Sequence, residues 1–296
     1  MIERLVPRLP AFVQEMPVRL ESAKREIQTR GASLYLQYWG IDHRLTPSGK
    51  EHWNNLLRKF KNRERVNPST EIGVVDGFDY HVTGVDKLES LDPEKGFLLI
   101  SNHSNEGPVR GWGQVFVMSH AVKQATGKDI VWAQGSAASG SSNAVRESVR
   151  TIKVKHEKNW KKKIRKKLHI KSSGNGITGA KNILRSMKTE AVGIFPEGTQ
   201  KRDLKKGDSR TGVIIASAAR QGIPVVCIST SFTNGEIFVS ADILDSSEIQ
   251  RLESSYENPY QAIVDYTMIT IASHLPKNRR GHYRGKTALQ PQSTNV

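Results

Sequence analysis

Short apolar runs bounded by polar turns recur along the middle of this 296-residue chain. Uninterrupted apolar runs are typical of strands buried on both faces of a sheet. Between them lie segments whose apolar residues recur at spacings of three and four, as in helices that pack on a sheet. This alternation predicts an α/β fold, with a mostly parallel central sheet flanked by helices. The expected strands are 74–75, 80–82, 97–100, 130–133, 191–195, 225–228 and 237–239.

The chain divides into three expected parts: an N-terminal helical segment (1–70), an α/β domain (71–280) and a polar tail expected to be disordered (281–296). Asp76-Gly77 lies between two apolar runs and predicts a β-hairpin at the start of the α/β domain. The helices expected in that domain cover 112–121, 177–188, 213–220 and 259–275.

In the N-terminal segment the helical pattern is expected to break at Pro47-Ser48-Gly49. The helix after this break places four large apolar side chains on one face, Trp53, Leu56, Leu57 and Phe60. Basic residues surround that face. It packs on the core of the protein or lies on an anionic membrane surface, and the sequence leaves both interpretations open.

Two of the expected strands end in polar turns that carry a carboxylate. Residues 97–100 lead into Ser101-Asn102-His103-Ser104-Asn105-Glu106, and residues 191–195 lead into Pro196-Glu197-Gly198-Thr199. In α/β proteins, ligands bind outside the carboxyl ends of parallel strands, so the two turns are expected to share one site. His103 is the natural general base because the pKa of imidazole lies near neutrality.

The spacing of three residues between His103 and Glu106 would place both side chains on one face if the turn opens a helix. We therefore predict that they form a base and carboxylate dyad. The alternative is structural: His103 caps a helix or bonds within a turn, and Glu197 caps the segment that follows it.

These motifs resemble those of the glycerolipid acyltransferases, which acylate glycerol-3-phosphate or lysophosphatidic acid. Ser101-Asn102-His103 followed by an acid resembles the first motif of that family, and Phe195-Pro196-Glu197-Gly198-Thr199 resembles the third. Ile223-Pro224-Val225-Val226 is similar to the fourth, and Leu275-Pro276 with Arg280-Gly281-His282-Tyr283 is a weaker echo. The order and spacing agree over roughly residues 72–235.

The sequence departs from the family pattern at three places. Pro108 stands where the family carries its Asp, and Glu106 comes two positions earlier. Gln200 stands where an Arg usually follows the third motif, although Lys201 and Arg202 come directly after it. The second motif is not clearly present, and Lys171 is the best candidate for its basic residue.

The resemblance implies transfer of an acyl chain from acyl-CoA or acyl carrier protein to a lysophospholipid or glycerol phosphate. It implies His103 and Glu106 as the catalytic pair, and Glu197 as the acceptor of a hydrogen bond from a glycerol hydroxyl. Gly198 is expected to permit close approach of the backbone to the substrate, and Thr199 is expected to bind the substrate beside it. The basic side chains expected to bind the phosphate are Lys171, Lys201 and Arg202. No metal is expected, and no cofactor apart from the acyl donor.

The charge of the chain adds an expectation about partners. The formal net charge is +16, which favours anionic partners such as a membrane surface. Residues 150–171 contain 11 Lys and Arg and one acidic residue. This run could be a solvated helix, a contact with anionic lipid or a nucleic-acid patch. Nucleic acid ranks last, because Trp160 is the only aromatic residue there for base stacking.

Two further features of the sequence limit where in the cell the protein is expected to work. The single cysteine, Cys227, excludes an internal disulfide and favours a reducing compartment. No apolar run approaches the ~20 residues that span a bilayer. We therefore expect a cytoplasmic protein that lies on a membrane. The alternative class is a catalytically degenerate relative that has kept the fold and binds an anionic membrane or a partner.

Overall fold

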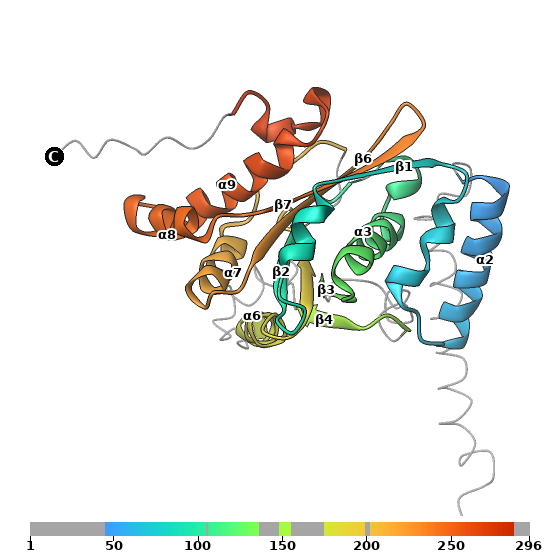
Figure 1. Cartoon of the computed structure of the whole chain (residues 1–296), viewed down its shortest axis with the longest axis horizontal. Helices are drawn as coiled ribbons and strands as arrows, with labels where there is room; N and C mark the ends of the chain where they lie inside the picture. The colour runs from blue at the N-terminus through green and yellow to red at the C-terminus, as the bar shows by residue number, and fades with distance from the viewer. Residues whose placement is uncertain (1–44, 105, 136–147, 155–174, 199–201, 287–296) are drawn as a thin grey trace, which may run out of the picture.

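The computed structural model describes residues 45–104, 106–135, 148–154, 175–198 and 202–286, and they form a three-layer α/β/α arrangement (Figure 1). Seven strands make one sheet in the order β1-β7-β6-β2-β5-β3-β4. The strands are β1 Asp79–Thr83, β2 Phe97–Ser101, β3 Ile130–Gly135, β4 Thr151–Val154, β5 Ala191–Ile194, β6 Val225–Thr233 and β7 Glu236–Ile243. The predicted α/β class is confirmed.

Five adjacent strands, from β6 to β4, run parallel to one another. The strands β6 and β7 form an antiparallel pair, and β1 pairs in parallel with β7. The sheet is thus mostly parallel, as predicted, with two strands of opposite direction at one edge. A parallel centre places the carboxyl ends of β2 and β5 side by side, because Ile100 pairs with Ile194.

Helices cover both faces of the sheet. The α-helices are α2 Pro47–Asn62, α3 Trp112–Thr126, α6 Asn175–Ser186, α7 Ser209–Arg220, α8 Ser246–Ser255 and α9 Pro259–Ser273. Short 3₁₀ segments are η1 Pro68–Thr70, η2 Ile72–Val75, η3 Val85–Ser90, η4 Gly107–Val109, η5 Lys277–Arg279 and η6 Gly281–Tyr283. In Figure 1, α2 and α3 lie on one side of the sheet, and α6, α7, α8 and α9 lie on the other.

The central strand β2 shows why these sequences form a sheet with two covered faces. All five of its residues are buried. Phe97 and Leu99 belong to the apolar core under α2 and α3, whereas Leu98 and Ile100 belong to the core under α6 to α9. A strand with apolar side chains on both faces is stable only between two layers of helices, because each face removes apolar surface from water.

Helix α2 resolves the alternatives for the N-terminal apolar face. Trp53, Leu56 and Phe60 are buried in the core shared with α3, so this face packs on the protein. The predicted break at residues 47–49 is the start of the helix instead. Thr46 caps it by accepting a hydrogen bond from the Gly49 N–H, and Pro47 fits the first turn.

The predicted hairpin across Asp76-Gly77 is wrong. Ile72–Val75 forms the 3₁₀ segment η2 rather than a strand. Strand β1 pairs with β7, which is far away in sequence. Val74 and Val75 are buried in the core with α2 and α3, and that packing decides their conformation over their preference for strands. The turn at Gly77, with φ of 82°, is still made.

Two further differences lie near the C-terminal half. The tail is expected to be disordered from residue 281, but residues 281–286 are described and Tyr283 is 1% exposed, so this part is folded; residues 287–296 lie outside the described residues. Residues 151–154 of the basic run form β4, so this part of the run is a strand and not a helix. The remainder of the run, 155–171, lies outside the described residues, as do residues 1–44 of the N-terminal segment.

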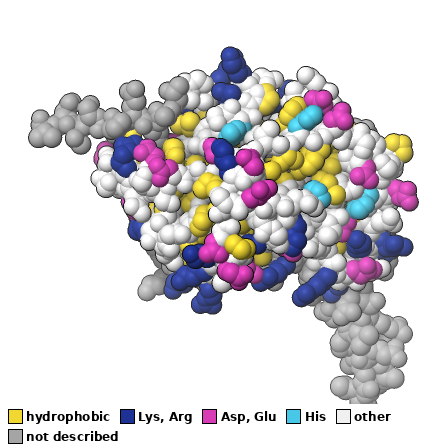
Figure 2. Space-filling view, in the orientation of Figure 1, with side chains coloured by type: hydrophobic (Ala, Val, Ile, Leu, Met, Phe, Trp, Pro, Cys, Tyr) yellow, Lys and Arg dark blue, Asp and Glu magenta, His cyan; other side chains and the backbone are white. Residues whose placement is uncertain are grey.

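Lysines and arginines gather along the lower margin of the face seen in Figure 2, with acidic side chains among them. Among the described residues, none of the helices is both long and apolar enough to cross a membrane.

Candidate functional site

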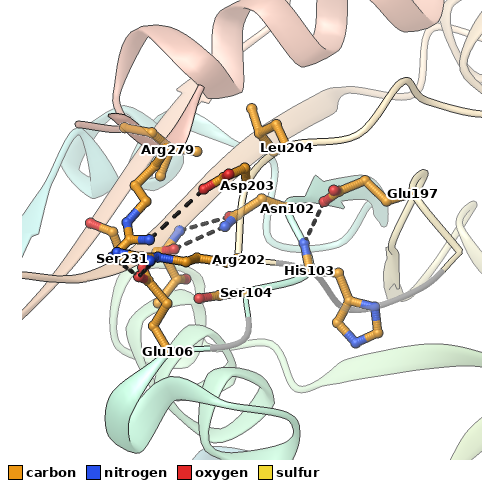
Figure 3. A pocket seen from close by; sticks show the side chains of 12 residues that line it. Asn102, His103, Ser104, Glu106, Glu197, Arg202, Asp203, Leu204, Ser231 and Arg279 are labelled. Atoms are coloured by element: carbon orange, nitrogen blue, oxygen red, sulfur yellow. Dashed lines mark hydrogen bonds and ion pairs between the residues drawn. The ribbon is translucent and has the colours of Figure 1, made fainter. Parts of the chain in front are cut away.

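A pocket lies beyond the carboxyl ends of the central strands β2 and β5 (Figure 3). Its empty volume, which includes its open mouth, is about 240 Å³. The turn after β2, the turn after β5, the far part of β6 and the segment η5 all contribute to its lining. The prediction that the two polar turns share one site is therefore supported by their positions in the fold.

One hydrogen bond joins the two turns. The backbone N–H of His103 donates to Glu197 Oε1 at 2.7 Å, across 94 residues of sequence. The other carboxylate oxygen of Glu197 accepts from the backbone N–H of Lys205 at 2.9 Å. Glu197 therefore holds the His103 turn against the segment that follows β5.

Asn102 holds the same turn to β6. Its Nδ2 donates to the Thr230 carbonyl and its Oδ1 accepts from the Thr230 N–H, both at 2.9 Å. This is possible because β6 runs past the end of β2. From α3, Gln114 donates to the Asn102 carbonyl at 2.6 Å and accepts from the Ser104 N–H at 2.9 Å. Side chains from three elements thus fix the backbone on both sides of His103.

The His103 ring stacks on Phe195, with ring centroids 4.4 Å apart and an interplanar angle of 17°. Phe195 stacks in turn on Trp132 at 4.8 Å. The Nδ1 atom of His103 is buried and has no hydrogen-bond partner among the described residues. Burial lowers the pKa of His103 to about 4. The imidazole is therefore neutral at physiological pH, which is the form that can accept a proton.

Glu106 is not paired with His103. Its side chain is 9% exposed, its carboxylate forms an ion pair with Arg279, and the Nε of Arg202 is 3.9 Å from its Oε1. Figure 3 shows the His103 ring pointing away from Glu106. The structure therefore does not assemble the predicted dyad. The backbone explains why, since the segment after Ser104 opens no α-helix: Glu106 is extended (φ −131°, ψ 139°) and only the short η4 follows.

The electrostatics of the two carboxylates differ. Burial raises the pKa of Glu197 to about 7, and this effect outweighs the two backbone N–H bonds and the nearby Lys205. Burial also raises the pKa of Glu106, while Arg279 and Arg202 oppose that rise. Because both oxygens of Glu197 already accept backbone hydrogen bonds, its visible role is to position the turn. Its predicted bond to a glycerol hydroxyl stays a prediction.

The other predicted substrate-binding residues divide into two groups. Gly198 lies at the exposed turn with φ of 65°, and Arg202 lines the pocket. Thr199, Lys201 and Lys171 lie outside the described residues.

Sequence reasoning missed Arg279. It lies on η5, 82 positions after Glu197, and reaches the pocket with its side chain 13% exposed. The weak similarity at Leu275-Pro276 and Arg280 drew attention to this region, but nothing in the pattern singled out residue 279. The C-terminal region contributes to the site only because the chain folds back over it.

Three buried polar atoms of the pocket lining have no hydrogen-bond partner among the described residues, namely His103 Nδ1, Thr230 Oγ1 and Arg279 Nη1. Buried polar groups are normally satisfied, so such atoms point to a polar ligand or to water. The described residues contain no group of three His, Cys, Asp or Glu side chains placed to hold a metal ion. The arrangement offers a neutral imidazole at one end and two guanidinium groups at the other.

No protein-family model matches the sequence, and no curated protein is detectably similar to it. Among solved structures, the chain is similar to the 1-acyl-sn-glycerophosphate (LPA) acyltransferase PlsC from Thermotoga maritima. The sequence identity is 14% and the TM-score 0.41, over 84% of this chain and 98% of that chain. With so low a TM-score and identity, the function has to be argued from the site itself.

Proposed function

We propose that this protein transfers an acyl chain from acyl-CoA or acyl carrier protein to a hydroxyl of a lysophospholipid or glycerol phosphate. The observation that carries the proposal is the 2.7 Å bond between the His103 N–H and Glu197. It joins the two motifs that resemble those of the glycerolipid acyltransferases, and residues of both motifs line one pocket. Two turns that lie 94 residues apart would rarely be joined in this way by chance.

The reaction balances with the groups in the pocket. Because Nδ1 of His103 is buried, Nε2 is the ring nitrogen that would take the proton of the acceptor hydroxyl. The hydroxyl oxygen attacks the thioester carbonyl, the carbon–sulfur bond breaks, and the imidazolium returns the proton to the departing thiolate. Fixing the backbone around His103 serves this step, because small displacements of a catalytic group lower the rate strongly.

The partners follow from charge. The phosphate of the acceptor would meet the arginines of the pocket, and the net charge of +16 would favour an anionic membrane, where such acceptors reside. We extend the proposal accordingly to a protein that works at a membrane surface.

A second candidate is favoured by one specific observation. Among the described residues His103 has no carboxylate partner, and Glu106 is bound to Arg279 instead. A base without such a partner is poorly oriented, and its imidazolium is not stabilised. The second candidate is therefore an acyltransferase-like protein that binds anionic lipid without catalysing transfer.

The test measures transfer of labelled acyl groups from acyl-CoA and from acyl carrier protein to lysophosphatidic acid and glycerol-3-phosphate. His103→Ala is expected to lower turnover by about 10² to 10⁴, which is the usual contribution of general base catalysis. His81→Ala is the matched control, because His81 is exposed on β1 and stacks on Phe238 outside the pocket lining. Unchanged turnover in His103→Ala would contradict the assignment. Absence of transfer, with vesicle binding intact, would favour the second candidate.

A further inference from the structure

Arg279 and Glu106 form the charged centre of the pocket. The side chain of Arg279 is 13% exposed and that of Glu106 is 9% exposed, so both side chains are largely withdrawn from water. One nitrogen of Arg279, Nη2, pairs with Glu106, and Nη1 lies 3.8 Å from the exposed Asp203. That Nη1 is buried and makes no hydrogen bond to any described residue. In the described part of the chain, this nitrogen of Arg279 therefore has a long ion pair with Asp203 but no hydrogen bond.

The backbone behind Arg279 is held firmly. Its carbonyl accepts from the Leu204 N–H at 3.1 Å, and the Leu204 carbonyl accepts from the His282 N–H at 2.9 Å. The buried Tyr283 hydroxyl donates to Asp265 at 2.7 Å and accepts from the Gly207 N–H at 3.0 Å. Residues 279–283 are thus bonded along the loop 204–207. An arginine on such a support is preorganised, so less entropy is lost when it binds a ligand.

The group that Arg279 Nη2 binds in this structure is the carboxylate of Glu106, from the same chain. A guanidinium binds carboxylate and phosphate with the same fork of donors, so a carboxylate can occupy the position of a phosphate. Arg202 lies close to the same Glu106 oxygen, at 3.9 Å, and the unpartnered Thr230 hydroxyl also lines the pocket. Two arginines beside one anionic group, with a hydroxyl elsewhere in the same pocket lining, are a donor set suited to a phosphate monoester.

We propose that Arg279 anchors a phosphate monoester in this pocket and that Glu106 occupies the anchor until the phosphate displaces it. The identity of the molecule that carries the phosphate rests on the proposed function, whereas the anion site rests on the contacts of Arg279. The exchange of Glu106 for a phosphate also favours phosphate monoesters over phosphodiesters. A phosphate monoester carries a charge of roughly −1.5 to −2 at neutral pH and can displace a single carboxylate. Phosphodiesters, with one charge, compete less well for the same arginines.

The test is direct binding of inorganic phosphate and of glycerol-3-phosphate to the full chain, by calorimetry at constant ionic strength and without an acyl donor. Arg279→Gln is expected to weaken the binding of both ligands by about tenfold or more, because a charge-assisted hydrogen bond is lost. Glu106→Gln is expected to strengthen it, because the competing charge is gone. Arg284→Gln is the matched control: it removes the same charge from an exposed position five residues further along, and should leave binding unchanged.

The single variant Arg279→Gln leaves Glu106 buried without its partner and could unfold. The double variant Glu106→Gln with Arg279→Gln removes both charges, and it is expected to fold and to bind phosphate no better than Arg279→Gln. Wild-type phosphate affinity in the double variant would overturn the anchor, and weaker binding in Glu106→Gln would overturn the displacement. Tighter binding of glycerol-3-phosphate than of phosphate would support a glycerophosphate ligand, and equal binding would support a site for the phosphate group alone.

The two proposals fail separately. Phosphate binding that depends on Arg279, in a protein without acyl transfer, would contradict the enzymatic function and leave the anion site standing. Acyl transfer to glycerol-3-phosphate that is unaffected in KM by Arg279→Gln would contradict the anion site and leave the function standing.

Discussion

The two ends of the pocket are held in place by different kinds of interaction. At the His103 end, side chains of Asn102, Gln114 and Glu197 bond to backbone groups of other elements. At the Arg279 end, side chains pair with side chains, and the partners are charged. Bonds to buried backbone groups cannot be given up without leaving those groups unsatisfied. Charged side chains at a pocket can change partners when another ion arrives. The comparison suggests a fixed position for the base and an exchangeable one for the anion.

The largest expected effect tests the fixed end. Asn102→Ala removes two hydrogen bonds to the buried Thr230 backbone, and should lower the free energy of unfolding by roughly 4 kcal/mol. Asn62→Ala is the control, because Asn62 bonds to Glu64 at an exposed position. Denaturant unfolding measures both variants. Equal, small losses in the two would show that the His103 end is not held in this way.

The next effect is a dependence on pH. In the fold the pKa of Glu197 is about 7, against an ordinary value of 4.5, so between these values the folded state keeps a proton that the unfolded state has lost. The stability that this group contributes is present below about pH 4.5 and is lost as pH rises through 7, a change of about 3 kcal/mol. Glu197→Gln lacks this proton. Relative to wild type, it should therefore gain stability as pH rises from 5 to 8.

Comparing the variant with wild type is essential in that experiment, because His103 acts in the opposite sense. Its pKa is lowered from 6.5 to about 4, so its contribution is lost as pH falls through this range. Both proteins contain His103, and its effect cancels in the difference. Glu236→Gln, at the partly exposed first residue of β7, corrects for the loss of one negative charge. A difference between Glu197→Gln and wild type that does not change with pH would contradict the prediction.

The third effect tests the exchangeable end. A double-mutant cycle of Glu106→Gln and Arg279→Gln should give a coupling energy of about 2 kcal/mol in unfolding experiments. The coupling should decrease when salt or phosphate is added, because both compete for Arg279. The Asn102→Ala effect should stay constant under the same conditions. A coupling that phosphate leaves unchanged would remove the contrast between the two ends.

The smallest effect concerns the support behind Arg279. Tyr283→Phe removes the hydroxyl that bonds to Asp265 and Gly207, at a cost of about 1 kcal/mol in stability. It should also weaken phosphate binding, because the segment carrying Arg279 loses part of its support. Tyr80→Phe is the matched control: Tyr80 bonds to the Val117 carbonyl, away from the pocket. Equal phosphate binding in the two variants would show that Tyr283 serves stability alone.

Much of the fold could be predicted from local patterns. The buried strands β2, β3, β5, β6 and β7 and the helices α3, α6, α7 and α9 lie where apolar periodicity placed them, apart from their ends. Helix α8 was missed because its sequence is polar and contributes only Ile249 and Leu252 to the core. Strand β4 was missed because its residues stand at the start of a basic run.

The sequence by itself determined the α/β class and the two polar turns at the ends of adjacent strands, because buried strands and amphipathic helices leave a periodic record in the chain. The tertiary structure decided which side chains meet. The extended backbone at Glu106 separates it from His103, and the return of the chain after α9 brings Arg279 to Glu106 instead. Pairings between residues that lie far apart in sequence depend on packing, and local periodicity carries no information about them.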